Sequence, residues 1–237
     1  MESAGLQRFP VASLIRRNLS VVAAVIALWV AGSLLAIAQD EVATRVRAAT
    51  EGSTKPYVYP AIDPALAING AALLSELRKG GYVLFMRHTE TGTVTPECTQ
   101  PNLTARGERD ARFVGESLRT MGIRIGRVVT SPVCRVLQTA KLLEMGEPEI
   151  SADLSNIPTP ADADLGAIRQ RRLAEVPGRA TNTMLVSHLQ SGKSPSHWIH
   201  LDFGEIVVYK SDGKGGATAV ARIRADDWYD LKALNGK

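Results

Sequence analysis

The stretch YVLFMRHTETG, Tyr82–Gly92, sets five apolar residues in a row and follows them at once with an arginine and a histidine. A continuous apolar run of this length is typical of a strand buried on both faces of a parallel sheet. Open α/β sheets bind their ligands at the carboxyl ends of such strands, where Arg87 and His88 would lie. The simpler alternative is a strand end that leaves the sheet into solvent, and this stretch alone fits both interpretations.

Segments typical of strands and of helices alternate around this stretch. We expect helices over residues 69–81, 102–122, 132–146 and 164–176. We expect strands over residues 82–86, 126–131, 149–150, 183–188, 205–210 and 219–224. Thr104 is placed to cap the second helix, and Pro132 suits the first turn of the third. The alternation predicts one α/β domain over residues 69–237, a three-layer sandwich whose mostly parallel central sheet has helices on both faces.

The first residues of the chain have a different character. Two arginines precede the uncharged segment 19–38, which is long enough to span a bilayer as a helix. The segment ends in an A-x-A pattern that signal peptidase can cut. We therefore expect residues 1–39 to be a signal peptide or a membrane anchor, followed by a linker over residues 40–68. Either alternative predicts export to the periplasm or another extracytoplasmic compartment, with membrane contact only through the uncleaved segment.

Charge and cysteine content narrow the class of protein further. Three of the 28 basic and one of the 24 acidic residues precede Asp40, so the rest of the chain is nearly balanced. It has neither the excess of positive charge nor the run of Lys and Arg that is typical of nucleic-acid-binding proteins. The chain's two cysteines are Cys98 and Cys134. An even pair in an exported domain indicates a disulfide, with two buried thiols as the alternative.

Three of the expected strands end at, or just before, an arginine or a histidine. Arg87 and His88 follow the first strand, Arg135 lies just after the second, and His188 ends another. If these strands are parallel neighbours, the four side chains meet at one edge of the sheet. Two guanidinium groups, two imidazoles and a helix N-terminus suit a dianionic phosphoryl group. No spacing of Cys, His or carboxylates here is typical of a zinc site, so we expect no metal.

Four segments in this order resemble the histidine phosphatase superfamily, which has the phosphoglycerate-mutase-like fold: FMRHTE at 85–90, NLTARGERDA at 102–111, VVTSPVCRVLQTA at 128–140 and LVSH at 185–188. The resemblance runs from about residue 69 to the C-terminus. It implies that His88 is the nucleophile and forms a phosphohistidine that water then hydrolyses. It also implies that Arg87, Arg135 and His188 hold the phosphoryl oxygens, and that no cofactor takes part.

The chain departs from this family's pattern in two ways. Thr89 stands where a glycine usually follows the nucleophile, and Ser187 stands where glycine is common before the second histidine. The acid that must protonate the leaving oxygen is also not evident. Asp153 lies in the corresponding segment without the usual context, Glu90 is near the nucleophile, and Glu205 opens the next strand. The residues alone do not choose among these three candidates.

The short stretch 136–187 between Arg135 and His188 leaves little room for the large cap of the family's mutases. The resemblance is therefore to the small-cap branch, and a phosphatase is favoured over a mutase. We then expect the segment Thr89–Pro101 to form a wall of the site and to determine which substrates it accepts. A Cys98–Cys134 bond would pin this segment to the turn before Arg135, so that the disulfide would position the site as well as stabilise the fold.

The sequence thus predicts an exported phosphomonoesterase that works through phospho-His88 without a metal. The expected substrate is a phosphorylated small molecule such as a sugar phosphate, a glycan such as a lipopolysaccharide phosphate, or a phosphoprotein that carries phosphohistidine. Three alternatives stay open: a mutase-like phosphotransferase, a non-catalytic module that binds a phosphate ligand, and a membrane-tethered interaction protein.

Overall fold

The computed structural model describes residues 62–96, 98–156, 164–189 and 199–235. The chain divides into two compact units, Met1–Pro56 and Tyr57–Lys237, and every described residue belongs to the second. The expected leader and most of the expected linker lie outside the described residues. Among the residues that are described, no helix is both long enough and apolar enough to cross a membrane.

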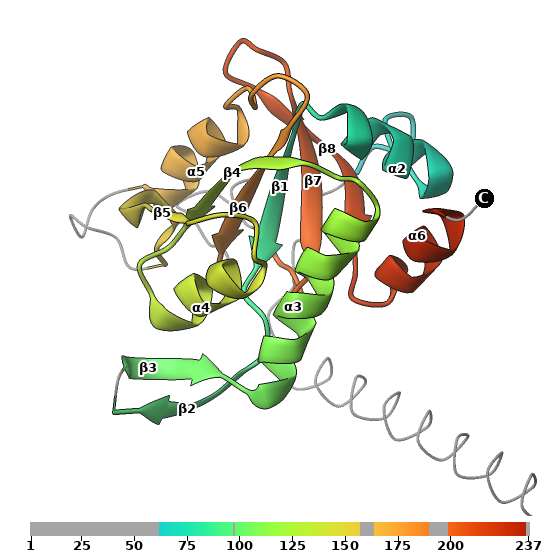
Figure 1. Cartoon of the computed structure of the whole chain (residues 1–237). Coiled ribbons are helices and arrows are strands. Elements are labelled where there is room, and N and C mark those ends of the chain that lie inside the picture. The colour runs from blue at the N-terminus through green and yellow to red at the C-terminus, as the bar shows by residue number, and fades with distance from the viewer. Residues whose placement is uncertain (1–61, 97, 157–163, 190–198, 236–237) are drawn as a thin grey trace, which may run out of the picture. The chain divides into compact units, whose positions relative to one another are not determined.

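A mixed sheet forms the centre of the second unit (Figure 1). Within the described residues its six strands lie in the order β5 (Glu149–Ile150), β4 (Ile125–Thr130), β6 (Asn182–Ser187), β1 (Tyr82–Arg87), β7 (Ile206–Ser211) and β8 (Ala217–Ile223). The first four are mutually parallel, and β7 runs antiparallel to β1 and to β8. The predicted mostly parallel sheet is thus confirmed, with β7 as its reversed strand.

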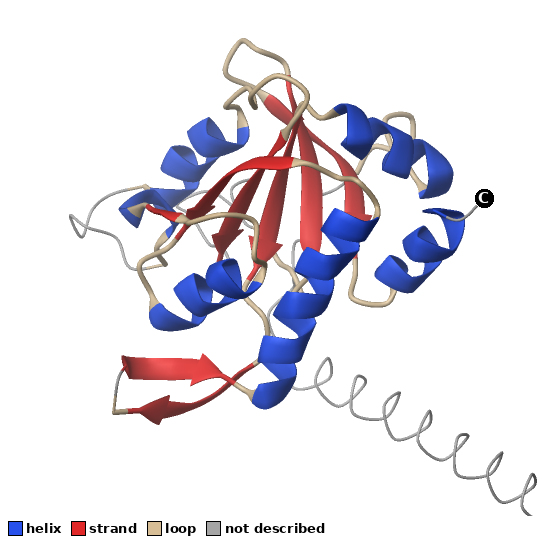
Figure 2. Cartoon of the chain, viewed as in Figure 1, coloured by secondary structure: helices blue, strands red, loops and turns tan. Residues whose placement is uncertain are grey.

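Helices cover both faces of this sheet, as Figure 2 shows. The helices are α2 (Gly70–Lys79), α3 (Ala105–Thr120), α4 (Cys134–Leu142), α5 (Leu165–Leu173) and α6 (Asp227–Asn235), with a short 3₁₀ helix η1 (Ala152–Leu154). The hydroxyl of Thr104 accepts a hydrogen bond from the Gly107 N–H and so caps α3 as expected. The predicted three-layer α/β sandwich is confirmed.

Strand β1 shows how the two outer layers are attached. Its side chains alternate between the faces, as the pleat of a strand requires. Leu84 and Met86 belong to the core shared with α2, α3, α4 and α6. Val83 and Phe85 belong to the core on the other face, which includes Leu173 of α5. β1 is thus buried on both faces, which explains its continuous apolar run. Because β1 is an inner strand, its carboxyl end lies in the middle of one edge of the sheet.

Three features differ from the sequence-based expectation. Helix α4 begins at Cys134 with Val133 as its N-cap, so Pro132 lies just outside the first turn where we expected it. The segment expected as a loop after His88 forms a hairpin of β2 (Thr91–Thr95) and β3 (Cys98–Leu103). Helix α6 was not expected; it buries Trp228 and Leu231 against the core.

Candidate active site

The structure brings together the ends of three parallel strands. Strand β6 lies between β4 and β1, and Arg87 at the end of β1 is in register with Ser187 at the end of β6. His88 and His188 follow these two residues, and Ser131 follows the end of β4. The parallel arrangement on which the predicted site depended is therefore present, and it places the two histidines at one edge of the sheet.

Arg135, in the first turn of α4, joins the two imidazoles. Its Nε–H donates to Nε2 of His88 at 3.2 Å, and its Nη2 lies 3.2 Å from Nδ1 of His188. The two rings are 5.5 Å apart between centroids. Three of the four predicted site residues thus form one connected group, and in the described part of the chain no carboxylate is bonded to any of these three side chains.

The surroundings of His88 select one neutral tautomer. Nδ1 lies 2.9 Å from the carbonyl oxygen of Thr89, which can only accept, so Nδ1 carries the proton. Nε2 then has its lone pair directed toward Arg135. Burial lowers the pKa of His88 to about 4; the Thr89 hydrogen bond opposes this shift, and the charges of Arg87 and Arg135 add to it. His88 is therefore neutral at physiological pH, with Nε2 available as a nucleophile.

His188 has the opposite arrangement of ring nitrogens. Because Arg135 can only donate, Nδ1 of His188 accepts, and Nε2–H donates to the hydroxyl of Ser131 at 3.1 Å. Burial lowers the pKa of His188 to about 3, helped by the charges of Arg135, His88, Arg87 and Arg169. Sequence reasoning missed Ser131, although a polar residue directly after a predicted parallel strand is itself a usable signal.

The segment from Leu201 to Glu205 supports Arg87 and the backbone of His88. The Leu201 carbonyl accepts from Nη1 of Arg87 at 2.8 Å, and the Arg87 guanidinium carbon lies 4.0 Å from the centre of the Phe203 ring. The Gly204 N–H donates to the His88 carbonyl at 3.2 Å. Sequence reasoning did not identify Phe203, because an aromatic residue outside any motif carries no local signal of this contact.

The two departures from the family pattern have structural counterparts. Thr89 is buried, and its hydroxyl shares a hydrogen bond of 3.3 Å with the hydroxyl of Thr139 on α4. The hydroxyl of Ser187 donates to the carbonyl of Leu154 at 2.7 Å. Both side chains therefore tie the strand ends to neighbouring elements, where a glycine could form no such bond.

Of the candidate acids, Glu205 is the most constrained. Its side chain is 1% exposed, forms an ion pair with Arg222, and accepts from the Asp202 N–H at 2.7 Å. Glu90 is more exposed, and its carboxylate accepts from the Thr104 hydroxyl at 2.8 Å. No contact within the described residues joins either carboxylate to the imidazole of His88.

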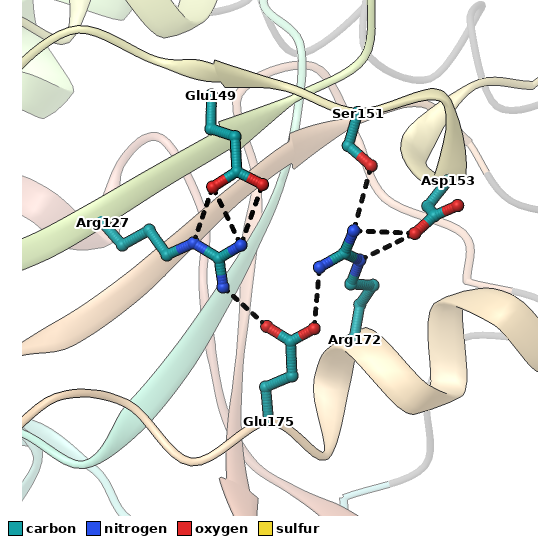
Figure 3. A network of polar contacts seen from close by, with 6 residues as sticks. All are labelled: Arg127, Glu149, Ser151, Asp153, Arg172 and Glu175. Carbon is teal, nitrogen blue, oxygen red and sulfur yellow. Dashed lines mark hydrogen bonds and ion pairs between the residues drawn. The ribbon is translucent and has the colours of Figure 1, made fainter.

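Asp153 belongs to a polar network that includes neither of the two imidazoles (Figure 3). Its carboxylate bonds to Nε of Arg172 at 2.9 Å and to Nη2 at 2.7 Å. Arg172 also contacts Glu175, which in turn contacts Arg127. The network ties η1 and α5 to the edge of the sheet, and it gives Asp153 a structural role.

Cys98 and Cys134 form a disulfide with a Cα–Cα distance of 6.4 Å. The predicted bond is confirmed, and the alternative of two buried thiols is wrong. It joins β3 to the first residue of α4, next to Arg135. A further contact that sequence reasoning missed lies beside it: Nη1 of Arg135 donates to Oε1 of Gln100 at 3.0 Å.

Comparison with known proteins finds one matching family model. Residues 83–184 match the family model of the histidine phosphatase superfamily (branch 1). Among curated proteins, no sequence matches the chain. Within the described residues, no group of three His, Cys, Asp or Glu side chains lies close enough to hold a metal ion.

Several solved structures share the fold at low identity. The protein histidine phosphatase SixA complexed with tungstate is 20% identical with a TM-score of 0.47, and the match covers 62% of this chain and 98% of that one. Alpha-ribazole phosphatase from Shigella flexneri is 18% identical with a TM-score of 0.42, covering 58% and 94%. A phosphoserine phosphatase mutant from Entamoeba histolytica, in complex with phosphoserine, is 16% identical with a TM-score of 0.40, covering 61% and 97%. At these scores they add nothing to the family match.

Proposed function

We propose that this chain, whose residues 83–184 match the model of the histidine phosphatase superfamily, hydrolyses phosphomonoesters through a phosphohistidine formed on His88. The observation that carries the proposal is the neutral imidazole of His88, with Nε2 beside the guanidinium of Arg135. Nε2 attacks phosphorus in line, the N–P bond forms, and the bond to the leaving oxygen breaks. Water then attacks the phosphohistidine, which releases orthophosphate and restores the imidazole.

The charge of the site supports a dianionic phosphoryl group. Arg135 bonds two imidazole nitrogens in the absence of substrate. Phosphoryl oxygens are stronger acceptors for these N–H groups, and the guanidinium fork matches them bidentately. Arg135 also lies in the first turn of α4, where the helix dipole adds partial positive charge. Arg87 supplies the second guanidinium, oriented by Leu201 and Phe203.

We assign His188 to the stabilisation of the transition state. In the free protein its Nδ1 accepts from Arg135, so it cannot donate to a phosphoryl oxygen in that form. An approaching dianion favours the charged imidazolium, which then donates from Nδ1 while Nε2–H stays on Ser131. Ser131 thus holds the ring orientation in both protonation states.

For the general acid we propose Glu90. The carboxylate of Glu205 is buried and both its oxygens are bonded to Arg222, so it is committed to that pair. Asp153 is bonded to Arg172. Glu90 lies two residues after the proposed nucleophile, is partly exposed, and accepts from the Thr104 hydroxyl at 2.8 Å, with the guanidinium of Arg106 more distant at 3.9 Å. Activated aryl esters need little help from an acid, so Glu90→Gln would slow alkyl phosphates much more than aryl phosphates.

We also propose that the domain works outside the cytoplasm. The uncharged segment 19–38 after two arginines supports this location, and so does a disulfide, because disulfides persist in oxidising compartments. The substrate would be a phosphorylated small molecule, a glycan phosphate or a phosphoprotein. The short connection between α4 and β6 supports a phosphatase over a mutase.

The deciding experiment is hydrolysis of an aryl phosphate by the full chain in EDTA, beside His88→Ala. We expect turnover in EDTA and a loss of roughly a thousandfold or more in the variant, since removal of a covalent nucleophile abolishes its pathway. A base-stable, acid-labile phosphoryl label on the wild-type protein, absent from the variant, would identify the intermediate.

Hydrolysis that persists in His88→Ala would overturn the mechanism. A chain that binds orthophosphate but hydrolyses neither aryl nor alkyl phosphates would instead be a binding module. The separation of the three candidate acids from the His88 imidazole is the observation that favours this second function.

A further inference from the structure

The hairpin strand β3 is attached to helix α4 at three points in succession. Cys98 is bonded to Cys134, Gln100 accepts from Arg135 at 3.0 Å, and the Leu103 N–H donates to Oε1 of Gln138 at 3.2 Å. The hairpin lies beyond the carboxyl end of β1, apart from the main sheet (Figure 1). Its contacts with α4 therefore decide where β3 sits relative to the phosphoryl-binding arginine.

The contact from Gln100 completes the set of groups that orient Arg135. Nε and Nη2 of this guanidinium bond the two imidazoles, and Nη1 bonds Gln100. An arginine side chain has about 2 kcal/mol of rotamer entropy to lose when it is ordered, so a site gains affinity when the free protein already holds the fork. A bound phosphoryl group would replace the imidazoles as the acceptor for Nε and Nη2 of Arg135. The hydrogen bond from Nη1 to Gln100 would remain.

We infer that Gln100 is a positioning residue for Arg135, and that the Cys98–Cys134 disulfide acts on phosphate affinity through it. This inference rests on the proposed function. Cys98 and Gln100 of β3 both reach α4, the first through the disulfide and the second through its side-chain amide. The disulfide fixes β3 to the residue preceding Arg135, and this fixes the distance over which the amide of Gln100 reaches the guanidinium.

The first test measures orthophosphate binding to the full chain by titration calorimetry, with Gln100→Ala and Gln100→Glu. We expect Gln100→Ala to weaken binding about three- to tenfold, the size of effect that the loss of one ordinary hydrogen bond has. Gln100→Glu keeps an acceptor for Arg135 but adds a negative charge beside the dianion, so it weakens binding by a larger factor. Gln138→Ala is the matched control, since it removes a contact between β3 and α4 that does not involve Arg135.

The second test is a double-mutant cycle. Cys98→Ser/Cys134→Ser should weaken orthophosphate binding by about the same factor as Gln100→Ala, and adding Gln100→Ala to it should change little more, because the two act on one interaction. Thermal unfolding of each variant, measured without phosphate, checks that it is folded. In turnover assays, Gln100→Ala should raise KM more than it lowers kcat.

Equal binding by Gln100→Ala and the wild type, or equal losses in Gln100→Ala and Gln138→Ala, would overturn the inference. Losses that multiply in the cycle would show that the disulfide does not act through Gln100. If Gln100→Ala binds normally while His88→Ala has lost turnover, the inference fails and the proposed function stands. If wild-type protein neither binds orthophosphate nor hydrolyses phosphate esters, both fail.

Discussion

Strands β1 and β3 both bring side chains to Arg135, but they are held in place by different means. β1 is central in the sheet, its residues Tyr82–Met86 are buried, and it pairs with β6 on one side and β7 on the other. Among the described strands, β3 pairs with β2 alone and owes its position to a disulfide and to contacts with α4. His88, which we propose as the nucleophile, therefore directly follows the strand held by burial, and Gln100, to which we assign the positioning of Arg135, lies on the strand held by the disulfide.

The largest difference between these regions should appear in stability. Phe85→Ala on β1 removes a fully buried ring and should lower the free energy of unfolding by about 3–5 kcal/mol. Val94→Ala on β2, where the side chain is 57% exposed, should change it by less than about 0.5 kcal/mol. Urea unfolding measures both. Equal losses would mean that the hairpin is part of the same cooperative core.

Removing the disulfide should have the next largest effect on stability. Cys98→Ser/Cys134→Ser opens a loop that spans a sequence separation of 36, so we expect a loss of about 2–4 kcal/mol, mainly through the freer unfolded chain. Far-ultraviolet circular dichroism of the folded variant should be unchanged, because the bond does not hold the six-stranded sheet. A folded state that has lost sheet signal would contradict the division between β1 and β3.

Mild acid should lower the free energy of unfolding through the two buried imidazoles of the site. Burial lowers the pKa of His88 to about 4 and that of His188 to about 3, so between these values and the ordinary 6.5 the unfolded chain binds more protons than the folded one. Stability is therefore full above pH 6.5 and falls as the pH is lowered below it, by about 1–2 kcal/mol per imidazole down to pH 5.

Urea unfolding at pH 7 and pH 5 measures this loss, and His188→Gln is the control. The variant removes one of the two titrating rings, so its stability should depend less steeply on pH. A variant with the same slope as the wild type would show that His188 titrates normally in the folded protein.

The smallest effect is expected in the network of Figure 3. Asp153→Asn weakens a partly exposed ion pair with Arg172, so it should cost less than about 1 kcal/mol and leave turnover unchanged. Glu175→Gln, in the same network, is the matched control for stability. A loss of alkyl phosphate turnover confined to Asp153→Asn would make Asp153 the general acid in place of Glu90.

Much of the domain was predictable because its signals are local. The apolar run at Tyr82–Met86 predicts a buried strand, Thr104 predicts a helix start, and the two cysteines predict their own bond. The alternation of strands and helices predicts that these strands are parallel, whereas the order β4, β6, β1, which brings His88 and His188 together, comes from the structure.

The parts that could not be predicted depend on distant partners. The hairpin β2–β3 contains Pro101 and mostly exposed positions on β2, so neither hydrophobic alternation nor strand propensity marks it. Its place is decided by Cys134 and Gln138 on another element. The contact of Arg87 with Phe203 is also long-range, and so is the pairing of Glu205 with Arg222 that removes a candidate acid.

Arg87 and His88 are held by Leu201, Phe203 and Gly204, which the ribosome makes much later. A ribosome adds about 5–20 residues per second, so Leu201 is made roughly 6–23 seconds after His88. Contacts that span so much sequence form late in folding. A chain that stops before residue 199 would contain all four motifs of the family resemblance. Arg87 would lack its contacts with the Leu201 carbonyl and the Phe203 ring. An ordered Arg87 can therefore contribute to the site only after Leu201 and Phe203 have been made.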